Sequence, residues 1–242
     1  MNKIFRRILN AILPPRCKKC GKVIHDDDGL CEDCFREINF ISAPYCSKCG
    51  IPFAEVPRGR RKLICGNCAK DKHPLFRMSR AAVKYDDVSK PMILALKFMD
   101  RTDNAAILAK WMKLAGKDIW AQGVDMIIPI PLHYTRLIKR RYNQAGLLAK
   151  ELSRLTDIPV DFTSVIRHRK TRPQVEFSGH ERVKNVRGAF SVKHPERLKG
   201  KRIVLIDDVM TTGSTLKECA LALKAAGVKS IDTLTVARVC RV

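Results

Sequence analysis

The sequence contains no run of 18 apolar residues, so no membrane-spanning helix is expected. It contains neither the G-x-G-x-x-G pattern of dinucleotide-binding folds nor the G-x-x-x-x-G-K-[ST] pattern of P-loops, which argues against both nucleotide-binding classes. Aromatic residues make up only 6% of the 242 residues, and no stacking platform for single-stranded nucleic acid stands out. Acidic residues are also scarce, since 24 of them face 47 basic residues and leave a formal net charge of +23.

The basic excess is concentrated in two regions of the chain. Residues 1–80 carry about +9 and residues 131–202 about +12, whereas residues 81–130 and 203–242 are each near +1. Such clustering indicates anionic ligands, namely phosphates, pyrophosphate or nucleic acid, with solubility alone as the alternative.

The first 16 residues predict a short amphipathic helix that packs on the protein. Apolar residues recur there at helical spacing, and two prolines end the pattern: Ile4, Phe5, Ile8, Leu9, Ile12, Leu13, then Pro14 and Pro15. Arg6, Arg7 and Asn10 interrupt the apolar stretch and no small-residue cleavage site follows, so a secretion signal is not expected. A membrane anchor is the alternative. With no targeting signal, we expect a cytoplasmic protein.

Eight of the ten cysteines form four C-x-x-C pairs within residues 17–75: Cys17/Cys20, Cys31/Cys34, Cys46/Cys49 and Cys65/Cys68. This spacing lets both thiolates of a pair reach one metal, and zinc prefers four sulfurs, so the pattern predicts two structural zinc ions. Sequential pairing is the expected arrangement, with a cross-braced one as the alternative. A disulfide framework would require an oxidising compartment, which nothing here indicates. The isolated Cys219 and Cys240 are interpreted as small buried residues.

Residues 76–242 predict an α/β domain built around a mainly parallel sheet with flanking helices. Strands are expected at residues 80–85, 125–132, 158–162, 189–193, 201–209 and 230–239. Helices are expected at residues 88–98, with Ser89 as N-cap and Pro91 in the first turn, and at 104–120, at 143–155 and after the strand at 201–209. In such sheets, ligands bind at the carboxyl ends of the strands.

The stretch RIVLIDDVMTTGST, residues 202–215, predicts the ligand. Its strand ends in Asp207 and Asp208, and a hydroxyl- and glycine-rich turn follows: Thr211, Thr212, Gly213, Ser214 and Thr215. Backbone N–H groups, hydroxyls and a helix N-terminus form an anion site at such a turn. The carboxylates, which only accept hydrogen bonds, are natural partners for a vicinal diol. A phosphate close to a diol describes a ribose 5-phosphate.

The run VLIDDVMTTGST resembles the binding signature for phosphoribosyl pyrophosphate (PRPP) in type I phosphoribosyltransferases. PIPLHYTRLIKRRYNQA at residues 129–145 and the cysteine pairs resemble the ComF/ComFC family, as does a spaced polar series: Arg167, Thr171, Gln174, Arg182, Asn185 and Phe190. That family joins a double zinc ribbon to a phosphoribosyltransferase-like domain and is linked to competence, the uptake of transforming DNA. The resemblance covers essentially the whole chain. It implies a double zinc ribbon at residues 17–75 and a phosphoribosyltransferase-like domain at residues 76–242.

The resemblance also implies roles for individual residues. Asp207 and Asp208 match the acids that hold the ribose hydroxyls, and residues 211–215 match the 5-phosphate loop. Pro131 belongs to the loop at residues 129–133 that would face pyrophosphate. Arg140, Asn143 and Gln144 match the family's R-G-F-N-Q element. Arg141 stands where glycine is common and Tyr142 where phenylalanine is common, and a glycine position often requires special backbone angles.

The implied reaction displaces pyrophosphate from ribose carbon 1 by a nitrogen nucleophile. Charge builds on the leaving group, so Mg²⁺ and arginines are expected to carry most of the catalysis. The candidate arginines are Arg140, Arg167, Arg172 and Arg182. Lys97 is a weaker candidate and is interpreted as a lysine on a helix surface. Residues 167–188 would form a mobile loop that closes over the substrate, with a solvated connector as the alternative.

Three functions remain open at this point. The first is a PRPP-binding, phosphoribosyltransferase-like protein that serves DNA uptake. The second is a nucleotide-salvage enzyme with an attached zinc module. The third is a single-stranded DNA-binding protein that only senses PRPP. DNA and DNA-uptake proteins are therefore candidate partners beside PRPP or a related ribose phosphate, and binding to DNA would be mainly to phosphates and sensitive to salt.

Overall fold

The computed structural model describes residues 14–24, 29–55, 63–169 and 186–240. Residues 1–13 of the expected N-terminal helix lie outside this set, as do the candidate arginines Arg172 and Arg182 and most of the expected mobile loop. Within the described residues, no helix combines the length and apolar character needed to cross a membrane.

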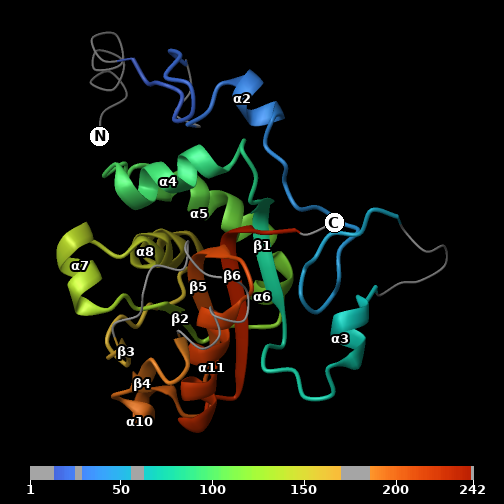
Figure 1. Cartoon of the computed structure of the whole chain (residues 1–242), viewed down its shortest axis with the longest axis vertical. Coiled ribbons are helices and arrows are strands. Elements are labelled where there is room, and N and C mark those ends of the chain that lie inside the picture. Colours follow the sequence, from blue (N-terminus) through green and yellow to red (C-terminus); the bar gives the residue numbers. More distant parts are fainter. Residues whose placement is uncertain (1–13, 25–28, 56–62, 170–185, 241–242) are drawn as a thin grey trace.

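The second part of the chain forms a four-stranded, fully parallel sheet (Figure 1). Its strand order is β1 (Ser79–Lys84), β6 (Ser230–Arg238), β5 (Arg202–Met210) and β2 (Met126–Pro129). The two central strands, β5 and β6, are almost entirely buried because helices cover both faces, as expected of parallel sheets. The α/β architecture predicted from the sequence is confirmed.

Side-chain alternation along β5 divides the core into two layers. Val204 and Ile206 pack against α4 (Lys90–Phe98), α5 (Asn104–Ala115) and α8 (Gln144–Thr156). Ile203 and Leu205 pack on the opposite face against α10 (Pro195–Leu198), α11 (Ser214–Ala225) and a small antiparallel pair, β3 (Val165–Arg167) and β4 (Phe190–Val192). Residues 207 and 208 continue this alternation, so their side chains leave the strand on opposite faces.

Two predicted elements are shorter in the structure than the sequence indicated. The helix expected at residues 104–120 divides at Gly116 into α5 and α6 (Lys117–Ala121), and the Trp120 ring packs where a Cβ at residue 116 would stand. The strand expected at residues 158–162 is a single parallel bridge between Val160 and Ile127. Pro159 can accept a hydrogen bond there but cannot donate one, which weakens a longer ladder.

Helix α7 (Tyr134–Arg140) forms in a stretch where the sequence analysis expected neither a helix nor a strand. The ring of His133 stands at its N-cap, where Nδ1 accepts a hydrogen bond from the backbone N–H of Thr135 at 3.4 Å. Tyr134, Leu137 and Ile138 on this helix are exposed, so the usual link between apolar periodicity and burial fails here.

Ser89 and Cys240 also differ from expectation. Ser89 stands at the N-cap of α4, but its hydroxyl donates to the carbonyl oxygen of Lys84 at 2.7 Å and does not cap the helix. Cys219, on the buried side of α11, is fully buried as expected, whereas Cys240 is only partly buried.

The cysteine-rich part contains two short helices, α2 (Glu32–Arg36) and α3 (Gly66–Lys70), and packs against the sheet domain. The knuckle at residues 46–50 lies beside β1. The backbone N–H of Ser79 donates to the carbonyl oxygen of Lys48 at 2.8 Å, and the guanidinium of Arg80 donates to that of Ser47 at 3.0 Å. A Cβ at residue 50 would meet the Ser79 carbonyl oxygen at 2.6 Å, so this close approach requires Gly50.

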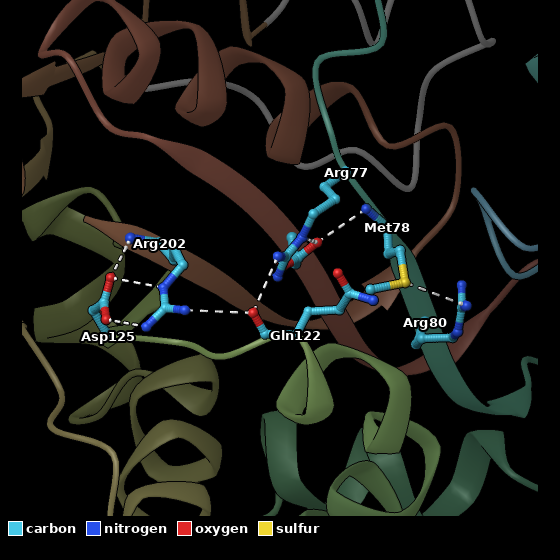
Figure 2. A network of polar contacts seen from close by, with 7 residues as sticks. Arg77, Met78, Arg80, Gln122, Asp125 and Arg202 are labelled. Carbon is cyan, nitrogen blue, oxygen red and sulfur yellow. Dashed lines mark hydrogen bonds and ion pairs between the residues drawn. The ribbon is translucent and has the colours of Figure 1, made fainter. Parts of the chain in front are cut away.

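A polar network closes the amino-terminal edge of the sheet (Figure 2). Arg202 pairs with Asp125, with a shortest separation of 2.7 Å, and Arg77 pairs with the fully buried carboxylate of Asp232. Both arginines also donate to the carbonyl oxygen of Gln122 at 3.5 Å. These contacts hold together the ends of β1, β2, β5 and β6 and leave the opposite edge for the ligand.

Candidate functional site

A cleft of about 900 Å³ opens at the carboxyl edge of the sheet. Its basic lining comes mainly from helices: Lys90, Lys97, Arg136, Lys139, Arg140, Arg141 and, from the end of β3, Arg167. Three carboxylates face these cations: Asp100, Asp207 and Asp208. A cleft with this balance attracts an anionic ligand while keeping a small acidic centre.

Asp207 and Asp208 both line the cleft, and Lys97 interacts electrostatically with both of them. The Oδ2 atom of Asp208 lies 2.7 Å from Nζ of Lys97, on the α4 face of the sheet. Asp207 faces the α11 side, where it interacts electrostatically with Arg167. Each carboxylate also accepts a backbone hydrogen bond through Oδ1, Asp207 from the N–H of Asp208 at 2.9 Å and Asp208 from that of Val209 at 2.7 Å.

The surroundings of Asp207 shift its ionisation toward neutral pH. Burial and the neighbouring charge of Asp208 raise the pKa of Asp207 to about 7, although Lys97 and Arg167 act in the opposite direction. For Lys97, burial lowers the pKa, but attraction to Asp208 and Asp207 outweighs it and the net shift is upward. Lys97 is therefore charged at neutral pH, whereas Asp207 titrates near neutrality.

The turn after β5 has the form that the sequence indicated. Thr211 and Thr215 line the cleft, while the hydroxyls of Thr212 and Ser214 bond to each other at 2.6 Å. Gly213 stands at the N-cap of α11 with φ of 73°, in the left-handed region that glycine tolerates best. The turn thus presents hydroxyls and the N-terminus of a twelve-residue helix beside the two carboxylates.

Arg140, Arg141, Asn143 and Gln144 also line the cleft. The side chain of Asn143 caps α8 by accepting from the N–H of Ala145 at 3.1 Å, and it donates to the carbonyl oxygen of Ile130 at 2.9 Å. Gln144 is buried and accepts from Arg140 at 3.2 Å. Arg141 has φ of 64°, so the position where the family commonly has glycine does adopt the left-handed conformation.

Lys97 is not the surface lysine that the sequence suggested. It lies near the end of α4, lines the cleft and leaves only 26% of its side chain exposed. The hydroxyl of Tyr142 donates to the carbonyl oxygen of Leu96 at 2.9 Å, and the amide of Gln144 donates to that of Lys97 at 3.3 Å. Tyr142 and Gln144 therefore position the backbone of Lys97, a relationship that no local pattern could reveal.

Of the remaining candidate residues, some line the cleft and others do not. Arg167 lines the cleft with its guanidinium 5.3 Å from the ring centre of Phe190, and burial together with repulsion by Arg136 lowers its pKa to about 10. Ile130 and Leu132 line the cleft, whereas Pro131 between them is not among the lining residues. Arg136 was missed by the sequence analysis, although its spacing of four from Arg140 would place both on one side of a helix.

The eight paired cysteines form two separate sulfur clusters in the sequential arrangement. Cys17, Cys20, Cys31 and Cys34 form one and Cys46, Cys49, Cys65 and Cys68 the other, with all ligand atoms of a cluster within 4.8 Å of one another. Zinc binds thiolates at about 2.3 Å, which puts the corners of its tetrahedron about 3.8 Å apart. The 3.7 Å separations of Cys20 from Cys31 and of Cys49 from Cys65 fit that geometry. Both clusters are therefore suited to structural zinc.

Each of the two parts of the chain matches a known protein family. Residues 8–74 match the double zinc ribbon domain, and residues 143–240 match the phosphoribosyl transferase domain. Among solved structures, the chain is similar to a purine phosphoribosyltransferase from Pyrococcus horikoshii, with 19% identity over 55% of this chain and 73% of that one and a TM-score of 0.36.

Relatives of known name align over nearly the full length. Competence protein F of Haemophilus influenzae is 34% identical over 229 residues, covering 92% of this chain and 96% of the relative. The DNA utilization protein YhgH of Escherichia coli K12 is 31% identical, covering 87% and 90%. Competence protein ComFC of Bacillus subtilis is 25% identical, covering 88% and 86%.

Proposed function

This chain belongs to the ComF family of competence protein F, YhgH and ComFC, and from that premise we propose that it binds PRPP through the cleft at the carboxyl edge of its sheet. Asp207 and Asp208 would accept hydrogen bonds from the ribose hydroxyls. The turn at residues 211–215 would hold the 5-phosphate, and the basic wall around Arg140 would face the pyrophosphate.

One observation carries this proposal: paired carboxylates and a hydroxyl-bearing helix N-terminus lie side by side in an otherwise basic cleft. A simple phosphate would give the two carboxylates no role in binding, and a neutral sugar would leave the excess of seven basic over three acidic lining side chains uncompensated. A ribose that carries phosphate groups satisfies both parts of the site. The pyrophosphate on carbon 1 adds the negative charge that the basic wall can hold.

Mg²⁺ fits the same site by the chemistry of its donors. The carboxylate oxygens of Asp207 and Asp208 are hard ligands, and together with pyrophosphate oxygens they form the kind of set that Mg²⁺ prefers. When bound there, the ion would neutralise charge on the leaving pyrophosphate. Arg140 and Arg167, which line the cleft, would contribute to the same charge stabilisation.

The names of the relatives connect the family with competence and with the use of DNA. We propose that the present chain acts in the same context, where incoming DNA supplies bases and nucleotides. The strongly basic charge supports a polyanionic partner. In this setting, PRPP would serve either as the donor of a ribose 5-phosphate group to a base, with release of pyrophosphate, or as a signal of nucleotide supply.

Calorimetric titration with PRPP and Mg²⁺ tests the binding site. The double variant Asp207→Asn/Asp208→Asn should bind at least about tenfold more weakly than the wild type, since hydrogen bonds to charged groups contribute about 1.5–3 kcal/mol each. Asp157→Asn, at an exposed helix end, is the matched control and should bind normally. Undiminished affinity in the double variant would refute the ribose assignment. A screen of free bases for pyrophosphate release would then distinguish an enzyme from a PRPP sensor.

A further inference from the structure

Lys97 is an internal counter-ion of the acid that is proposed to hold the ribose. Its Nζ lies 2.7 Å from Oδ2 of Asp208, while Oδ1 of the same carboxylate accepts from the N–H of Val209 at 2.7 Å. Both oxygens of Asp208 are thus engaged within the protein. A sugar hydroxyl that bonds to Oδ2 must share that oxygen with Lys97 or replace it.

The backbone of Lys97 is held firmly, so its ammonium group has a restricted range. Tyr142 bonds to the carbonyl of Leu96, and Gln144 bonds to that of Lys97, so two side chains of the 140–144 turn fix the end of α4. Most of the Lys97 side chain is buried. An ammonium group placed in this way can change partners only within the cleft.

A second cation, Arg140, lies near enough to Lys97 to affect it electrostatically. The guanidinium of Arg140 lies 4.9 Å from the ring centre of Phe98, the residue next to Lys97, and it repels Lys97 electrostatically. Lys97 is therefore attracted by Asp208 and repelled by a second cation, Arg140. An anion that bridges Lys97 and Arg140 would relieve this repulsion.

The chemistry of the ribose shows where such an anion would come from. Carbon 1, which carries the pyrophosphate, is bonded directly to carbon 2 of the diol. The 5-phosphate is attached at the other side of the ring, where the turn with Thr211 and Thr215 would hold it. With the diol on Asp208, carbon 1 can thus face Lys97 and Arg140 while the 5-phosphate faces the turn.

Resting on the function proposed above, we propose that Lys97 is a specificity-determining residue that passes from Asp208 to the pyrophosphate when PRPP binds. A ligand with an anionic group on carbon 1 gives the displaced ammonium a new partner. Ribose 5-phosphate cannot do so and would leave a buried cation beside Arg140. The site therefore prefers ribose 5-phosphates that carry a second phosphate group at carbon 1.

The test compares PRPP with ribose 5-phosphate by calorimetry at one saturating Mg²⁺ concentration. In Lys97→Met the ratio of the two affinities should fall at least tenfold, with affinity for ribose 5-phosphate unchanged or increased. Lys97→Arg should keep most of the preference, because it restores the charge. Lys150→Met, which removes an exposed lysine of α8, is the matched control and should leave the ratio unchanged. Lys97→Gln, which keeps polarity without charge, gives the same comparison if methionine unfolds α4.

The outcomes separate this inference from the proposed function. If the wild type binds neither ligand, both are overturned. If it binds PRPP and the uncharged variants Lys97→Met and Lys97→Gln keep the wild-type ratio, or lose both ligands equally, the role of Lys97 is overturned and the PRPP site stands. Inorganic pyrophosphate gives an independent readout. It should bind more weakly to Lys97→Met and more tightly to Asp208→Asn, in which Lys97 is released, and the reverse order would contradict the exchange.

Discussion

The guanidinium of Arg238, at the carboxyl end of β6, donates a hydrogen bond to the backbone carbonyl oxygen of Cys49 in the second cysteine cluster. The N–H of the next residue, Val239, donates to the carbonyl oxygen of Met210 at 3.0 Å. Met210 directly precedes the proposed phosphate-binding turn. The end of β6 thus contacts both the second cluster and the strand that delivers the turn.

We expect loss of metal from the second cluster to loosen the end of β6. Without zinc, the knuckle that carries Cys49 loses its fixed shape and the hydrogen bond from Arg238 weakens. Hydrogen exchange measured by mass spectrometry should therefore be faster at the end of β6 in Cys68→Ser. The same substitution in the first cluster, Cys20→Ser, should leave this region unchanged. Equal exchange at β6 in the two variants would contradict the link.

Metal content tests the sequential grouping of the cysteines. The wild type should contain two zinc ions per chain, because the structure holds two four-cysteine clusters. Cys20→Ser/Cys31→Ser alters one cluster and should retain one ion, whereas Cys20→Ser/Cys49→Ser alters both and should retain none. A cross-braced arrangement of alternate pairs gives the reverse result. Mass spectrometry of the native protein or elemental analysis distinguishes the two.

The affinity for PRPP should depend on pH through Asp207. Burial and the charge of Asp208 raise the pKa of Asp207 to about 7, so lowering the pH from 8 to 6 protonates the carboxylate that would accept the sugar hydroxyls. Between these two pH values, the fraction of Asp207 that is ionised falls about tenfold. Affinity should fall in that direction, and calorimetry at a series of pH values measures it.

The phosphate groups of the ligand also titrate, so the variant Asp207→Asn provides the reference for this experiment. It has no carboxyl group at the position, and its affinity should vary less between pH 8 and pH 6 than that of the wild type. Identical pH profiles would show that Asp207 does not titrate in this range.

At residue 141, a glycine variant should be more stable to unfolding than an alanine variant, which is the reverse of the usual order. Its φ of 64° lies in the left-handed region, where a Cβ costs about 1 kcal/mol that glycine avoids. Arg141→Gly should therefore exceed Arg141→Ala in free energy of unfolding by about 1 kcal/mol. At Lys150, inside α8, alanine should be favoured by a similar amount, about 1 kcal/mol. Urea unfolding of the four variants measures both differences, and the usual order at residue 141 would contradict the backbone assignment.

Local patterns predicted the parts of the fold in which neighbouring residues carry the signal. The run from β5 through the turn to α11 was predicted because apolar strand, glycine turn and helical spacing follow one another directly. The cysteine clusters were predicted for the same reason, since the ligand spacing is local. Helix α7 was missed because it has only seven residues and follows a proline-containing loop, and β3 was missed because its strand partner β4 lies more than twenty residues away in the chain.

The sequence by itself determined the chemistry available to this protein: eight thiols in pairs, two acids at the end of a strand, a hydroxyl-rich turn and an excess of basic residues. Only the tertiary structure decided which of these groups meet. Lys97 and Asp208 are separated by 110 residues, and their ion pair exists because α4 packs on the face of the sheet to which residue 208 points. Side-chain alternation sends Asp207 to the other face, so two adjacent and identical residues differ in their contacts: Asp208 pairs with Lys97, whereas burial and the charge of Asp208 raise the pKa of Asp207 to about 7.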